Sequence, residues 1–93
     1  MKLPINYEES TPAVRREARL EYITKQDGCC WHCGDLLDGE PNESVTERPM
    51  DTNLFPEHFL TYPIHLHHCH ETGLSIGAVH ARCNADLWQY HGQ

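Results

Sequence analysis

The unusual chemistry of this chain is concentrated in one stretch, Pro63-Ile-His-Leu-His-His-Cys-His-Glu-Thr-Gly-Leu-Ser-Ile-Gly-Ala-Val-His-Ala-Arg-Cys-Asn84. It holds five of the eight histidines and two of the five cysteines. Imidazoles titrate near neutral pH, and thiolates bind metals or become oxidised, so residues of these types at such density point to a task beyond packing. We interpret the stretch as the carrier of two metal sites and the rest of the chain as its support.

Polarity and turn residues in this stretch predict a β-hairpin followed by a helix. Large apolar side chains occupy every second position of residues 62–67, as in a short strand. Residues 68–73 are expected to form the turn and residues 74–79 the returning strand, in which Gly77 marks a bulge or a close backbone approach. A helix is expected over residues 84–91.

An earlier helix is predicted over residues 12–27. Thr11 can cap free backbone N–H groups, and Pro12 at the first helical position loses no hydrogen bond. Residues 1–10 are polar and show no period, so we interpret them as an N-terminal arm.

Most of the acidity lies in the middle of the chain. Residues 34–62 carry seven acidic residues and one base, a net charge of −6 in a chain whose net charge is −7. Glycine, prolines and the lack of a period predict a long loop over residues 35–62 with one short turn near Leu54. Such a long loop is uncommon in a compact domain, so we expect it to be functional or tied down, and a metal closing its ends would hold it.

The size and composition of the chain also favour metal binding. We expect residues 1–93 to form a single small domain, whose core often needs added support, and the hydrophobic content of 39% is low. An odd number of cysteines, with no apolar N-terminal stretch, indicates metal in a reducing, cytoplasmic compartment rather than a disulfide framework. No stretch approaches the length of a transmembrane helix.

Two pairs of residues have the spacing of zinc ligands. Cys30 and Cys33 are separated by two residues, as are His80 and Cys83, and together they offer three thiolates and one imidazole. A site with four protein ligands would be structural and would add directly to the free energy of folding. Two alternatives stay open: Cys30 and Cys33 as a redox or buried pair, and a zinc ion that uses Cys29 or Cys69 in place of His80.

The remaining histidines suggest a second, open site. Hydrolysis of a phosphodiester needs a neutral imidazole to take a proton from water and a divalent cation to stabilise charge on the departing oxygen. His68 is a candidate for the base, and His67 and Asn84 are candidates for the cation ligands. In a strand His65 shares a face with His67 and not with His68, so all of them could meet one ion only if the chain bends after His67. A histidine-rich surface hairpin that binds adventitious metal is the alternative.

These residues resemble a known family. The stretch from Leu66 to Asn84, preceded by Cys30-Trp-His-Cys33, resembles the HNH endonucleases, and within them the small zinc-containing phage type related to recombination endonuclease VII. The resemblance covers roughly residues 12–92. It implies an α+β fold: a small zinc-stabilised ββα-metal (His-Me finger) domain over residues 63–92, with the N-terminal helix and the long acidic loop before it. It also implies a structural Zn²⁺ and a catalytic Mg²⁺ or Mn²⁺.

The resemblance assigns roles by position. His68 matches the general base, and His70 a nearby position that assists in some members. His67 and Asn84 match the ligands of the catalytic cation. The chain departs from the family pattern in three places: His80 where endonuclease VII-like proteins carry cysteine, Cys69 where an acidic or polar residue is more usual, and Trp88 where the third histidine of the HNH name is expected.

The implied function is metal-dependent cleavage of DNA in a bacterial host cell, in phage DNA processing or packaging and together with other phage proteins. On charge alone we assign phosphate contacts to Arg15, Arg16, Arg19 and Arg82, although a solvated helical face explains the first three equally well. The net charge argues against binding nucleic acid by overall attraction. The competing interpretation is a catalytically weak or inactive HNH-like zinc module that acts by protein binding or inhibition through its acidic loop. The sequence leaves the form of the DNA and the oligomeric state open.

Overall fold

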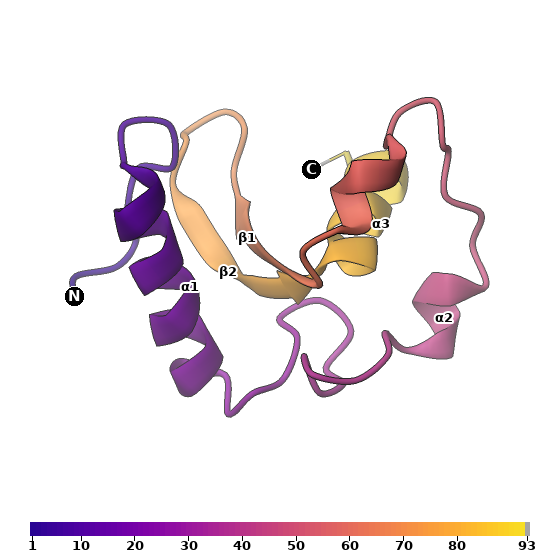
Figure 1. Ribbon diagram of the computed structural model, residues 1–93, viewed down its shortest axis with the longest axis horizontal. Coiled ribbons are helices and arrows are strands. Elements are labelled where there is room, and N and C mark those ends of the chain that lie inside the picture. The colour runs from indigo at the N-terminus through magenta and orange to yellow at the C-terminus, as the bar shows by residue number, and fades with distance from the viewer. Residues whose placement is uncertain (93) are drawn as a thin grey trace.

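A computed structural model describes residues 1–92, which form a two-stranded antiparallel sheet and four helical segments (Figure 1). The elements in chain order are α1 (Pro12–Lys25), α2 (Glu43–Thr46), the 3₁₀ helix η1 (Glu57–Leu60), β1 (Ile64–His68), β2 (Ser75–His80) and α3 (Ala81–His91). Helix α1 lies along one side of the hairpin and α3 at the other, and each contacts both strands. The chain is therefore a small α+β protein, as predicted.

Helix α1 begins and ends close to its predicted limits. The Thr11 hydroxyl accepts a hydrogen bond from the Val14 N–H group at 3.2 Å, and Pro12 occupies the first turn. At the other end Asp27 and Gly28 have φ angles of 55° and 76°. This left-handed backbone turns the chain away from the helix axis, so α1 ends at Lys25, two residues before the predicted boundary.

The hairpin contains a register shift beside the cluster of histidines. Pairing is regular from Ile64 to His67 and then shifts by one residue, so that His68 pairs with Ser75 and Ile76 has no Cα partner. A bulge of this kind bends a strand and re-aims the side chains next to it. The sequence required a bend after His67 for the histidines to share a site, and the irregularity lies at that position.

The edge of β2 that faces away from β1 is covered at Ala78. The Gln26 side chain pairs with Ala78 as a neighbouring strand would, donating to its carbonyl and accepting from its N–H group, both at 2.9 Å. The Trp31 N–H group donates to the same carbonyl at 3.0 Å. A Cβ atom on Gly77 would lie 2.9 Å from both Gln26 Oε1 and Trp31 Cγ. Gly77 is thus a site of close approach, one of the two roles predicted for it.

Helix α3 follows β2 without a loop. It begins at Ala81 rather than at Asn84, so both Cys83 and Asn84 lie in its first turn. Metal-ligand spacing does not distinguish a loop from the first turn of a helix, which is why the sequence placed this boundary three residues late. The Ala81 N–H group donates to the Pro63 carbonyl at 2.8 Å, which fixes the start of the helix against the start of the hairpin.

The acidic segment is more ordered than a loop with one turn. Helix α2 is capped by Asn42, whose side chain accepts from the Ser44 N–H group at 2.9 Å. Leu37, Val45 and Phe55 are 3%, 2% and 7% exposed, so the segment is fastened at three points. The prediction of a single turn was wrong because one buried residue in a four-residue helix leaves no periodic signal.

Residues of α3 hold this segment in place. Asp86 is fully buried and accepts hydrogen bonds from Arg48, with Nε at 2.8 Å, and from His32 Nε2 at 2.8 Å. Burial by itself raises the pKa of Asp86, but the hydrogen bonds from Arg48 and His32 outweigh it and hold the pKa below the usual value. Arg82 donates to the backbone carbonyls of Val45 and Arg48. Both bonds use Arg82 Nη2, so the guanidinium group predicted to contact phosphate also holds the acidic segment against α3.

The N-terminal arm is part of the fold. The Tyr7 N–H group donates to the Gly73 carbonyl at 2.8 Å, and the Ser75 N–H group donates to the Ile5 carbonyl at 2.9 Å. The Ser75 hydroxyl lies 2.9 Å from both the Ile5 nitrogen and the Tyr22 hydroxyl, so it joins the arm to α1. The interpretation of residues 1–10 as a polar lead-in did not anticipate this docking.

We expect Gly77→Ala to lower the free energy of unfolding by about 1–3 kcal/mol, because the added methyl group overlaps Trp31 and Gln26. Urea unfolding followed by circular dichroism measures the change. Gly39→Ala is the matched control, since its Cβ would meet only the Leu36 carbonyl oxygen at 3.6 Å. Equal stability of the two variants would contradict the close approach.

We expect Asp86→Asn to lower the free energy of unfolding by about 1–3 kcal/mol at neutral pH, because it removes the buried carboxylate charge that pairs with Arg48, whose side chain is 39% exposed and therefore partly screened by solvent. Asp51→Asn, a change at a less buried acidic residue of the same region, provides the comparison. A cost for Asp86→Asn no larger than that for Asp51→Asn would show that the buried ion pair does not hold the acidic segment.

Candidate functional site

The structure brings together the four residues predicted to bind zinc. One ligand atom from each of Cys30, Cys33, His80 and Cys83 lies within 4.8 Å of the others, so the group could hold a metal ion such as zinc. His80 Nδ1 is 3.5 Å from the sulfur atoms of both Cys33 and Cys83. Its Nε2 lies 2.8 Å from the Leu36 carbonyl oxygen. That hydrogen bond places the proton on Nε2 and leaves the lone pair of Nδ1 facing the thiols, as in metal sites with a second shell.

The protonation of the thiols also suits a cation. The pKa of Cys30 is lowered to about 4, first by a hydrogen bond from Cys83 and then by backbone N–H groups. The pKa of Cys83 is raised by the same hydrogen bond to Cys30, by burial and by the charges of its cysteine neighbours. The Cys30 thiolate is thus stabilised, and its negative charge opposes ionisation of Cys83. A divalent cation between them would neutralise this repulsion and allow both thiols to ionise.

Cys29 and Cys69 lie outside this group. All five cysteines are free thiols, and Cys29 directs its sulfur toward the Asp27 carbonyl oxygen at 3.8 Å. Cys69 lies in the hairpin turn, where hydrogen bonds from the Thr72 side chain and backbone lower its pKa. The group that the structure assembles includes His80 and neither of these two thiols, which favours the predicted set of four ligands over one in which Cys29 or Cys69 replaces His80.

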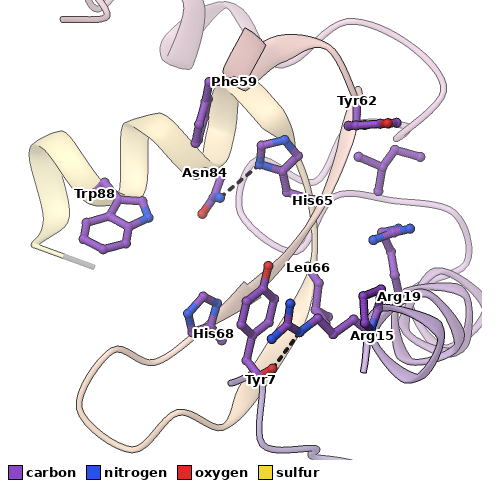
Figure 2. Close-up of a pocket in the computed structure, with 12 residues that line it drawn as sticks. Tyr7, Arg15, Arg19, Phe59, Tyr62, His65, Leu66, His68, Asn84 and Trp88 are labelled. Atoms are coloured by element: carbon purple, nitrogen blue, oxygen red, sulfur yellow. Dashed lines mark hydrogen bonds between the residues drawn. The ribbon is translucent and has the colours of Figure 1, made fainter. Parts of the chain in front are cut away.

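A cavity of about 510 Å³ lies between α1, the hairpin and α3 (Figure 2). Its walls include His65 and His68 from β1, Asn84 from α3 and Arg15 and Arg19 from α1. Aromatic and apolar side chains complete the lining: Tyr7, Pro12, Phe59, Tyr62, Ile64, Leu66 and Trp88. The volume is in the range typical of small-molecule sites.

His68 is held in the cavity wall by aromatic neighbours. Its ring stacks on Tyr7 with centroids 3.9 Å apart and planes 7° apart, and on His70 with centroids 4.5 Å apart. Burial lowers its pKa most, followed by the nearby His70, and these effects outweigh a hydrogen bond to the Leu66 carbonyl that raises it. The lowered pKa favours the neutral imidazole at pH 7, and a neutral imidazole has one ring nitrogen that can accept a proton.

Asn84 contacts His65 in the same cavity. Asn84 Nδ2 and His65 Nδ1 are 3.1 Å apart (Figure 2). Burial lowers the pKa of His65 most, against the backbone of Phe59 and Tyr62, which raises it. Because an amide nitrogen only donates, His65 Nδ1 accepts from the Asn84 amide. This orients Asn84 Oδ1 away from the ring, and within residues 1–92 that buried oxygen accepts no hydrogen bond.

His67 is placed differently from the expectation. Its side chain is fully buried, and its ring lies 5.6 Å from that of Trp31. It lines neither this cavity nor a smaller one of about 270 Å³ beside the hairpin turn, which includes His68, Cys69 and His70. The predicted pairing of His67 with Asn84 is therefore not what the structure shows: the histidine that contacts Asn84 is His65.

The four arginines assigned to phosphate binding have different surroundings. Arg15 and Arg19 line the cavity, and Arg15 Nε donates to the Tyr7 carbonyl at 2.6 Å with its guanidinium 4.2 Å from the Tyr7 ring. Arg16 is exposed and does not line the cavity. Arg82, as described above, binds backbone carbonyls. Only two of the four thus face the site.

Sequence reasoning missed Tyr7 and the group around Asp86. Tyr7 is one aromatic residue in a polar arm, and its stacking on His68 depends on backbone pairing that leaves no local pattern. His32, Asp86 and His91 also place ligand atoms within 4.8 Å of one another. Because Arg48 already neutralises the Asp86 carboxylate, we interpret this group as an ion-pair network and not as a metal site.

Comparison with known proteins adds no relative: no protein-family model, curated protein or solved structure matches this chain. Among residues 1–92, no helix combines the length and apolar character needed to cross a membrane.

We expect the purified protein to contain about one tightly held zinc ion per chain, and Cys83→Ser to lose both the zinc and the cooperative unfolding transition. Elemental analysis and thermal unfolding measure the two effects. Cys69→Ser is the control, since Cys69 lies outside the group and its loss should leave zinc content unchanged. Zinc content reduced equally by both substitutions would overturn the ligand assignment.

Proposed function

We propose that this protein is a metal-dependent DNA endonuclease of the HNH type that hydrolyses phosphodiester bonds. The observation that carries the proposal is the content of one cavity: a neutral imidazole, a buried amide oxygen that accepts no hydrogen bond, and two guanidinium groups. These are the groups that phosphodiester hydrolysis requires, namely a base, a candidate ligand for a hard cation, and positive charge for the phosphate.

His68 is the general base in this proposal. Its lowered pKa favours the unprotonated ring at neutral pH, and one nitrogen of a neutral imidazole can accept a proton from water. The His68 ring stacks on both Tyr7 and His70, which restricts its rotation. His70 supports His68 from one side and contacts the Trp88 ring edge-on with centroids 3.5 Å apart, which is consistent with an assisting role.

The residues present fit a divalent cation such as Mg²⁺ or Mn²⁺. Asn84 Oδ1 is an oxygen donor of the type such ions prefer, and its buried position without a hydrogen bond is costly unless a ligand satisfies it. When bound, the cation would supply neutralisation of charge on the departing 3′ oxygen. His65 orients Asn84, whereas His67 is fully buried and lines neither cavity, so it is not among the ligands of this proposal.

The arrangement of elements supports a ββα-metal fold within this proposal. The hairpin and α3 are consecutive, His68 lies at the end of β1, and Asn84 lies in the first turn of α3. The group that could hold zinc includes His80, at the end of β2, and Cys83, one residue before Asn84. A bound zinc ion would therefore fix the position of Asn84 relative to the hairpin.

The second candidate is an inactive zinc module that binds a protein partner. The observation that favours it is the enclosure of His68, whose ring has an aromatic ring against each face. Enclosure of both faces of the His68 ring still leaves its edge, where the nitrogens lie, open to a proton donor. The geometry is therefore compatible with His68 as the general base.

A cleavage assay with Mg²⁺ or Mn²⁺ on supercoiled plasmid and on single-stranded circular DNA tests the proposal. We expect the protein to cleave at least one of these DNAs and His68→Ala to be about 10²- to 10⁴-fold slower, the usual contribution of a general base. Asn84→Ala should also be strongly impaired, because it removes the proposed oxygen ligand.

His58→Ala is the matched control for this assay. His58 is an exposed histidine of η1 that does not line the cavity, so its loss should leave the nicking rate unchanged. Equal and negligible cleavage of both plasmid and single-stranded DNA by the wild-type protein and His68→Ala, with zinc and fold intact, would sink the nuclease proposal in favour of the protein-binding module.

A further inference from the structure

Exposed aromatic rings surround the cavity. Tyr62 is 75% exposed and Trp88 is 43% exposed, and both line the cavity together with Phe59. We refer to Tyr62, Phe59 and Trp88 as the aromatic rim. In Figure 2 the rings of Phe59 and Trp88 lie near the Asn84 side chain, while Tyr62 lies on the side of Arg19. Exposed rings that gather around one cavity, unlike rings scattered singly over a surface, are typical of a binding site.

The members of the aromatic rim differ in how firmly they are held. Phe59 packs against Phe55 and His65, with ring centroids 4.9 Å and 4.8 Å away, so it is part of a fixed wall. Tyr62 comes just after η1 and keeps most of its surface in solvent. A flat ligand could thus enter over a rigid wall and be covered by the Tyr62 ring.

Charge limits how the cavity can bind nucleic acid. The chain has a net charge of −7, and of the arginines only Arg15 and Arg19 line the cavity, with Arg15 Nε already donating to a backbone carbonyl. Two cations give few phosphate contacts, and phosphate contacts supply most of the affinity of proteins that bind duplex DNA. Affinity must then come largely from another source, and aromatic rings beside a cation offer base stacking.

We propose that the aromatic rim is a nucleobase subsite, and that the substrate is single-stranded DNA whose unpaired base stacks on Tyr62 and Phe59 while its phosphate lies at Arg19. A base inside a duplex has both faces covered by its neighbours, so only an unpaired base can enter such a subsite. This inference rests on the proposed function, because it assigns the form of DNA that the same cavity accepts.

Binding without divalent cations tests the subsite separately from cleavage. The probes are a fluorescent oligothymidylate of about ten nucleotides, an abasic strand of the same length, and a duplex of the same length. Fluorescence anisotropy gives the three affinities at one salt concentration. We expect the oligothymidylate to bind at least about tenfold more tightly than the abasic strand or the duplex, since base stacking is absent from one and blocked in the other.

Substitutions at Tyr62 provide the matched comparison. Tyr62→Leu should weaken oligothymidylate binding by roughly 5- to 100-fold, the range for loss of one stacked base, and leave abasic binding unchanged. Tyr62→Phe keeps the ring and should bind like the wild-type protein. Because Tyr62 is 75% exposed, both variants should fold, which circular dichroism checks. Equal binding of base-bearing and abasic strands, or an equal loss for both in Tyr62→Leu, would overturn the subsite.

The binding and nicking results separate the two proposals. A protein that nicks plasmid but binds abasic and base-bearing strands equally would keep its nuclease function and lose the subsite. A protein that prefers the base-bearing strand in a Tyr62-dependent way, yet cleaves no DNA, would support the subsite and overturn the nuclease.

Discussion

The meeting of Cys30 and Cys33 with His80 and Cys83 is the constraint on which most of this structure depends. The hydrophobic core is small, and two of these cysteines belong to it: Cys30 and Cys83 pack with Leu37, Val45, Ala78, Val79 and Leu87. A metal bound by these four side chains would therefore join the turn at residues 30–33, which follows α1, to the junction of β2 and α3 at the centre of the core. In a chain of this size, where apolar burial alone is marginal, the site and the core cannot be separated.

A second constraint, the Asp86 network, acts on the acidic segment. That segment repels itself, and its one base, Arg48, is bound to a buried carboxylate on α3. His32 binds the same carboxylate and lies between Cys30 and Cys33 in the chain. The turn at residues 30–33, the acidic segment and α3 are therefore connected twice, once through the cysteine and histidine group and once through Asp86. These two connections explain how a segment rich in like charges stays folded against the domain.

Features that depend on local chemistry could be predicted from the sequence. The Thr11-Pro12 start of α1, the hairpin with its turn at Gly73 and the four ligands at x2 spacing follow from short-range preferences that are visible in one chain. Features that depend on distant backbone pairing could not: the arm reaches His68 through Tyr7, and α2 depends on a single buried valine. The choice between His65 and His67 as the neighbour of Asn84 belongs to this second kind, because both occupy the same strand face in an ideal alternation and only packing against Trp31 and Phe59 distinguishes them.

The proposed active site depends on both kinds of feature at once. Local pattern supplies the reactive groups, His68 and Asn84, but their chemistry comes from neighbours that the pattern does not contain. Tyr7 helps to bury His68 and so favours the neutral imidazole, and His65 turns the amide of Asn84 so that its oxygen remains available. An acidic protein with only two arginines in its cavity can then act on a polyanion if the chemistry is carried by neutral groups and a bound cation, and if binding is carried by aromatic surface. Within this proposal, the shortage of positive charge weakens binding to duplex DNA and favours a strand whose bases are free to stack.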